Sequence, residues 1–191
     1  MDFFLKNKYR LIAILSLSLL GLILCSAIAS GSSKREAREY HLKAAFLRYV
    51  AKFVEWPESV LVDKKLNVCI LGNIPYYKAI DSINGKVVNE LELTVFKVPD
   101  VASSIEKNCQ ILFIAKTEED HTITIIDAIK DKPILSFGDM DSFAENGGDM
   151  NFYIMNNRLA IMINPLAIEQ ASLTISPRMM RLVTVLPPIQ Q

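Results

Sequence analysis

Apolar residues recur at intervals of three and four between positions 35 and 56, which predicts an amphipathic helix over Arg35–Trp56. Its apolar side carries Leu42, Phe46, Tyr49, Val50 and Phe53. Its polar side carries His41, Arg48, Lys52 and Glu55. Pro57 should end the helix, because the residue before a proline is disfavoured in helical conformation.

Short apolar runs then alternate with helical patterns. The runs predict strands at Leu66–Leu71, Leu91–Val98, Gln110–Ala115 and Pro133–Phe137. The segments between them predict helices at Tyr76–Ile83, Val101–Lys107 and Thr122–Lys130. Strands that alternate with helices form right-handed βαβ units, so a parallel sheet covered on both faces is expected.

The carboxyl-terminal third has a different pattern. Two strands, Met150–Met155 and Leu159–Asn164, flank Asn156-Asn157, a pair suited to a tight hairpin. Two helices are expected to follow, at Pro165–Ala171 and Arg178–Leu186, with Ser176-Pro177 as the start signal of the second. The fold class is therefore α/β: a three-layer sandwich with a mostly parallel sheet, an antiparallel hairpin on one edge and helices on both faces.

The amino terminus has the pattern of a secretory signal peptide. A basic start is followed by the apolar block Leu11–Leu24 and by small residues around Ala27 and Ala29. We expect a cleaved signal at 1–29, a short leader at 30–39, and one domain at 40–191 in the periplasm. An uncleaved membrane anchor is one alternative, and a lipoprotein attached at Cys25 is another, which the large residue Leu24 disfavours.

Charge and cysteine content limit the function classes. The whole chain has 21 basic and 21 acidic residues, and the signal holds three of the basic and one of the acidic residues, so the mature net charge is −2. Nucleic-acid binding is not expected at this charge, nor is membrane insertion after cleavage. Cys69 and Cys109 remain, and in an oxidising compartment a disulfide is favoured over two buried thiols. The two come close if the first and third strands are neighbours, as in a flavodoxin-like order.

No catalytic pattern is found. The chain has no phosphate-binding glycine motif and no serine-hydrolase elbow, and no cofactor or metal is expected. Open α/β sheets bind ligands at the carboxyl edge, where Gly72 and Asp139 follow strands. A small-solute site at these two residues is therefore the alternative function, and a hydrolase using Asp139 or Asp141 is a third one.

Several segments in order resemble the YfiR family of bacterial periplasmic proteins, over about Tyr40–Leu186. They are Lys43–Leu47, Phe53–Pro57, Val68–Gly72, Asn84–Lys86, Cys109–Ile114, Leu135–Asp139, Phe143-Ala144, Gly147-Gly148, Asn156–Arg158, Ile163-Asn164 and Arg181-Leu182. The resemblance implies a non-enzymatic repressor that binds the periplasmic part of an inner-membrane diguanylate cyclase. Such a protein lowers cyclic-di-GMP and biofilm formation.

The resemblance also bears on individual residues. Cysteines matching Cys69 and Cys109 form a disulfide in that family, whereas a second family disulfide has no counterpart because no cysteine follows Cys109. For partner binding we predict Arg158, Arg178, Met179 and Arg181, together with the polar side of the first helix. Pairing with a second copy of the chain stays open.

Overall fold

The chain divides into two units, Met1–Glu39 and Tyr40–Gln191. This computed structural model describes residues 33–187. Residues 33–39 of the first unit are helical, so the described part of the expected leader is helix. The signal peptide expected at 1–29, with Cys25, lies outside the described residues.

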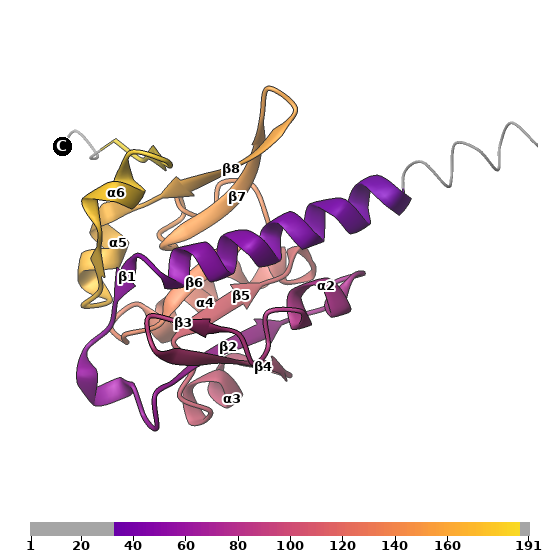
Figure 1. Ribbon diagram of the computed structural model, residues 1–191. Helices are drawn as coiled ribbons and strands as arrows, with labels where there is room; N and C mark the ends of the chain where they lie inside the picture. Colours follow the sequence, from indigo (N-terminus) through magenta and orange to yellow (C-terminus); the bar gives the residue numbers. More distant parts are fainter. Residues whose placement is uncertain (1–32, 188–191) are drawn as a thin grey trace, which may run out of the picture. The chain divides into compact units, whose positions relative to one another are not determined.

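The second unit is built on an eight-stranded mixed sheet (Figure 1). Its strands, in spatial order, are β10 (Thr184–Val185), β8 (Arg158–Ile163), β7 (Met150–Met155), β6 (Leu135–Gly138), β5 (Ile111–Ile114), β2 (Lys65–Leu71), β4 (Leu91–Val98) and β3 (Val87–Val88). Neighbouring strands from β4 to β7 run parallel, whereas β8 is antiparallel to β7 and β3 is antiparallel to β4. The α/β fold class predicted from the sequence is confirmed.

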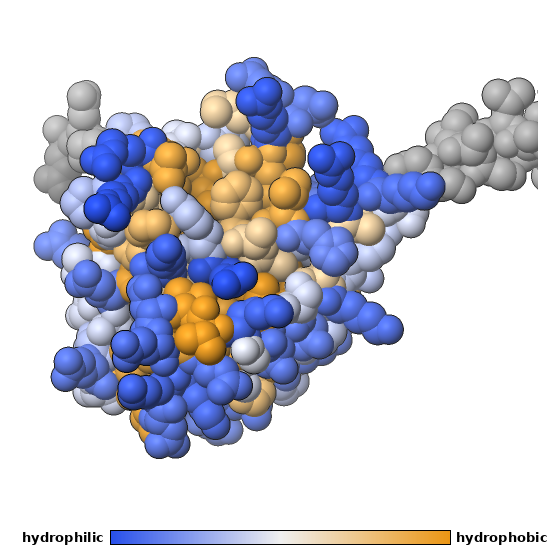
Figure 2. All heavy atoms as spheres, viewed as in Figure 1, coloured by the Kyte–Doolittle hydropathy of each residue, from blue (hydrophilic) through white to orange (hydrophobic). Residues whose placement is uncertain are grey.

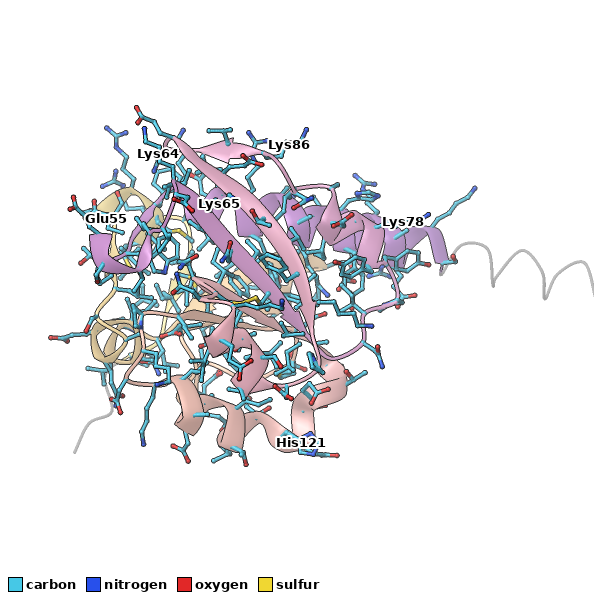
Figure 3. The ribbon with its side chains drawn as sticks, turned by 90° about the horizontal axis from the view of Figure 1, so that it is seen from below. Glu55, Lys64, Lys65, Lys78, Lys86 and His121 are labelled. Carbon is cyan, nitrogen blue, oxygen red and sulfur yellow. A yellow bond between two sulfur atoms is a disulfide. The ribbon has the colours of Figure 1, made fainter. Side chains whose placement is uncertain are left out.

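Helices cover both faces of this sheet (Figure 3). One apolar core lies beneath the first helix (residues 33–51), and also includes Ile80 of α2 (Tyr77–Asp81) and Ile168 of α5 (Pro165–Gln170). A second core on the other face includes Ile125 of α4 (Thr122–Ile129), with Val101 of α3 (Val101–Glu106) packed against it. Strands covered on both sides are buried along their whole length, as β5 and β6 are, and β5 is apolar throughout.

The strand order is the flavodoxin-like one on which the cysteine argument depends. β2 pairs in parallel with β4 on one side and with β5 on the other, so the first and third predicted strands are neighbours. The β7–β8 hairpin is also confirmed, and its turn residues Asn156 and Asn157 both have positive φ, at 49° and 60°. Positive φ at both central residues matches the twist of the flanking strands.

The first helix ends five residues earlier than predicted. It stops at residue 51, and the chain then forms β1 (Val54–Glu55), which pairs antiparallel with β9 (Thr174–Ile175). The backbone N–H of Ser176 also donates to the carbonyl of Phe53 at 2.8 Å. A pairing partner more than a hundred residues away decides this boundary, so Pro57 does not set it. A 3₁₀ turn at Glu58–Val60 follows.

The prediction of a last helix over Arg178–Leu186 was wrong. The helix α6 covers only Pro177–Met180, with the Ser176 side chain capping it as expected. The chain then turns and adds β10 to the edge of the sheet, where Thr184 lies opposite Met162 in parallel register. The β-branched residues Val183, Thr184 and Val185 favour a strand when an unpaired sheet edge lies within reach. Another 3₁₀ turn, Lys116–His121, precedes α4.

Candidate functional site

The two residues predicted to bind a ligand, Gly72 and Asp139, both lie at the carboxyl edge of the sheet. β2, β5 and β6 end in register, with Leu71 opposite Ile114 and Ile114 opposite Gly138. Gly72 and Asp139 each follow one of these strand ends. The sequence therefore placed both residues on the correct edge.

Asp139 is held by two side chains of the first helix. The Nζ atom of Lys43 lies 2.5 Å from Oδ1 of Asp139, and the hydroxyl of Tyr40 donates to Oδ2 at 3.0 Å. The side chains of Lys43 and Asp139 are only 5% and 7% exposed. The Lys43 ammonium also lies 4.4 Å from the centre of the Tyr40 ring. The chain thus neutralises this carboxylate with its own buried cation.

Gly72 lies against the loop that follows β5. Its φ is +86°, and a Cβ atom there would come within 2.6 Å of the Thr117 hydroxyl and 2.9 Å of the Glu118 side chain. The backbone N–H of Asn73 donates to the same Thr117 hydroxyl at 2.9 Å. Gly72 and Asp139 are thus both in contact with neighbouring groups of the chain. No group of three metal-ligating side chains occurs within residues 33–187.

The two remaining cysteines form a disulfide between neighbouring strands. Cys69 lies within β2, and Cys109 lies two residues before β5. Their Cα atoms are 5.9 Å apart, within the usual range for a disulfide. Both residues belong to the core that α4 covers, where they are at most 2% exposed. The link encloses the segment that carries α2, β3, β4 and α3.

A second buried carboxyl group, Asp149, precedes β7. Its Oδ2 atom accepts hydrogen bonds from the backbone N–H and the hydroxyl of Ser136, at 2.7 and 2.6 Å. Burial raises the pKa of Asp149 to about 6, and the hydrogen bonds from Ser136 oppose this rise. Nothing in the local sequence distinguishes Asp149 from the other acidic residues of this loop. The sequence analysis missed it for that reason.

We expect Asp149 to make stability depend on pH. Because its pKa is raised in the folded state, the folded chain binds the proton more tightly than the unfolded chain, whose ordinary value is 3.8. The free energy of unfolding should therefore fall by up to about 3 kcal/mol as pH rises from about 4 to about 6. The Asp149→Asn variant, which retains an oxygen acceptor, should lose this contribution. Urea unfolding at several pH values measures it, and parallel profiles for the two proteins would contradict it.

The predicted partner residues separate in the structure. Arg158 is exposed at the hairpin end of β8, four residues before Met162, which pairs with Thr184 of β10. Arg178 and Arg181 are exposed in and just after α6. Met179 is fully buried in the core beneath the first helix, so its side chain makes no surface contact. The arginines stay candidates, with Arg158 apart from the other two.

The first helix also has an exposed apolar side. The predicted apolar residues Leu42 and Tyr49 are 45% and 38% exposed, because the helix buries the side that carries Ala44 and Leu47 together with the predicted Val50. With Ala45, Phe46 and Leu182 they line a groove of about 410 Å³, the apolar groove below. Figure 2 shows apolar surface over the helix and the β7–β8 hairpin, and a smaller apolar area over β3, with hydrophilic surface between them.

A second groove lies beside the apolar groove, on the other side of Ala45 and Tyr49 of the first helix. It has a volume of about 460 Å³, and it lies between Arg48 of the helix and Lys52, which directly follows the helix, on one side and Val87 and Val88 of β3 on the other. Ala45 and Tyr49 line both grooves, so the two are continuous. We call this second one the basic groove. None of the residues lining either groove is acidic.

The decisive comparison is with known families. The YfiR/HmsC-like family matches residues 40–184, which is most of the chain and almost all of the second unit. The chain belongs to the YfiR/HmsC-like family. Membership supports a regulatory role in periplasmic cyclic-di-GMP signalling, in a family that is non-catalytic. No curated protein matches the chain.

One solved structure supports the fold. A conserved domain protein of Vibrio cholerae superposes with a TM-score of 0.53 at 12% identity, over 76% of this chain and 59% of that one. This YfiR/HmsC-like chain thus spans less than two thirds of that protein. The ABC domain from Streptococcus pneumonia in complex with L-Trp is more distant, with a TM-score of 0.45 at 10% identity over 67% of this chain and 59% of that one. Within residues 33–187, the helices are too short or too polar to cross a bilayer.

Proposed function

We propose that this YfiR/HmsC-like protein binds the periplasmic part of an inner-membrane diguanylate cyclase and restrains cyclic-di-GMP synthesis. The family match over residues 40–184 carries the proposal. The signal-peptide pattern at 1–29 supports export to the compartment where such a sensor part is exposed. At the carboxyl edge of the sheet, Gly72 and Asp139 contact side chains of the same chain. This arrangement is compatible with a regulator, which needs no catalytic group.

The surface supports a protein partner. Leu42, Tyr49 and Leu182 are each more than a third exposed and gather in the apolar groove, so a partner that covers them would remove apolar surface from water. Arg178 and Arg181 lie close in sequence to Leu182, which lines that groove. Arginine is enriched at protein interfaces. We include these two arginines in the contact surface and keep Arg158 as a separate, peripheral contact.

Deleting the gene tests the function directly. Cellular cyclic-di-GMP and surface attachment should rise, because the cyclase loses its restraint, and plasmid-borne protein should restore both. The rise should vanish in a strain that also lacks the diguanylate cyclase that co-purifies with the protein. Mass-spectrometric quantification of cyclic-di-GMP provides the measurement. An unchanged level after deletion would refute the proposed function.

A further inference from the structure

The first helix presents an apolar stripe and a basic stripe side by side. Leu42, Ala45, Phe46 and Tyr49 follow helical spacing and face outward along the apolar groove. Arg48 and Lys52, four residues apart, form the neighbouring stripe and line the basic groove. Beyond them lies Val87 of β3, which is 60% exposed.

Neither Arg48 nor Lys52 has a carboxylate partner among the residues that the structure describes. By contrast, Lys43 on the same helix is buried against Asp139. The chain therefore uses Lys43 internally and leaves Arg48 and Lys52 exposed beside an apolar groove. Carboxylates on a partner would complement these two charges.

The shape of this surface fits a helix. The stripe from Leu42 to Tyr49 spans two helical turns, about 10 Å at 1.5 Å per residue. Side chains at such spacing form ridges with grooves beside them, into which the ridges of a second helix pack. The apolar groove lies between this stripe and Leu182, which is 66% exposed. It can receive an apolar row from a partner helix.

Resting on the proposed function, we propose that the two grooves together bind an acidic amphipathic helix of the cyclase's periplasmic part. Its apolar row packs against Leu42, Tyr49 and Leu182, and its neighbouring carboxylates pair with Arg48 and Lys52. A second copy of this chain fits poorly, because two such faces would bring like charges together. The charge pattern thus favours a different, acidic chain.

Site-specific crosslinking in cells tests the occupant. A photoreactive phenylalanine analogue replaces Tyr49 in the full chain, and a matched control carries it at Ile123, which is 58% exposed on α4. We expect the Tyr49 position to crosslink to a cyclase segment with helical apolar spacing and adjacent Asp or Glu, and the control to give no such product. Crosslinking to a second copy, to lipid or to a segment without acidic residues would overturn the inference.

Charge reversal tests the role of the basic stripe. The double variant Arg48→Glu/Lys52→Glu should weaken co-purification of the cyclase by at least about tenfold, because two attractions become repulsions. It should also raise cyclic-di-GMP towards the level of the deletion strain. The control, Lys78→Glu/Lys116→Glu, makes the same charge change at exposed lysines of other elements. Equal binding by both double variants would overturn the inference.

These experiments separate the two proposals. If gene deletion raises cyclic-di-GMP but the Arg48→Glu/Lys52→Glu variant still represses fully, the proposed function is supported and the proposed binding surface is wrong. If deletion changes nothing, the proposed function itself fails. Thermal unfolding of each variant shows whether a loss of binding follows from a loss of folding.

Discussion

Replacing Lys43 by methionine should lower the free energy of unfolding by about 3–5 kcal/mol, because the variant removes the buried cation that pairs with the Asp139 carboxylate. Lys43 and Asp139 are 5% and 7% exposed, so water cannot solvate the remaining charge well. A loss of this size is a large fraction of the 5–15 kcal/mol typical of a folded domain. Urea unfolding followed by circular dichroism measures it.

Two controls isolate the buried charge. Lys130→Met removes an exposed pair, whose side chains are 44% and 62% exposed, and should cost at most about 1 kcal/mol. The double variant Lys43→Met/Asp139→Asn removes both charges and retains an acceptor for the Tyr40 hydroxyl, so it should be more stable than the single variant. If Lys43→Met costs no more than Lys130→Met, the pair contributes little to stability.

Loss of the Cys69–Cys109 disulfide should destabilise the protein by about 4 kcal/mol on the chain-entropy model, since the bond closes a 40-residue separation. Comparing oxidised and fully reduced wild-type protein isolates the crosslink, because both sulfur atoms remain in the core. The Cys69→Ala/Cys109→Ala variant should lose somewhat more, because it also leaves space in a buried cluster. Identical urea midpoints for the oxidised and reduced wild type would contradict this expectation.

Local sequence was sufficient to predict most of the sheet. Strand β5 is a continuous apolar run and β2 and β6 are mostly apolar, and the Asn156-Asn157 turn has a strong sequence preference, so both the strands and the turn were recognised. The family resemblance and the compartment argument agreed on Cys69 and Cys109, and the structure joins them. The strands and the turn depend on residues that are neighbours in sequence, and the disulfide depends on the two cysteines that follow the signal-peptide pattern.

Contacts between distant segments account for the errors. The first helix ends early because Val54 pairs with Ile175 in a short antiparallel sheet. The predicted last helix is replaced in part by strand β10, which pairs with the edge strand β8. Neither partner is visible in the local pattern. The buried pairing of Lys43 with Asp139 was missed for the same reason. One signal was present, because Lys43 has helical spacing with Leu47 and Val50 and therefore lies among residues that the helix buries.

The disulfide constrains one half of the sheet more than the other. Its covalent loop encloses the strands on the β3–β4 side, while no crosslink other than the backbone ties the strands from β6 to β10 to the rest, since no cysteine follows Cys109. A crosslink restricts the conformations that the segment it encloses can reach when the protein opens. We therefore expect partial opening to begin in the carboxyl-terminal half and the crosslinked half to stay compact for longer.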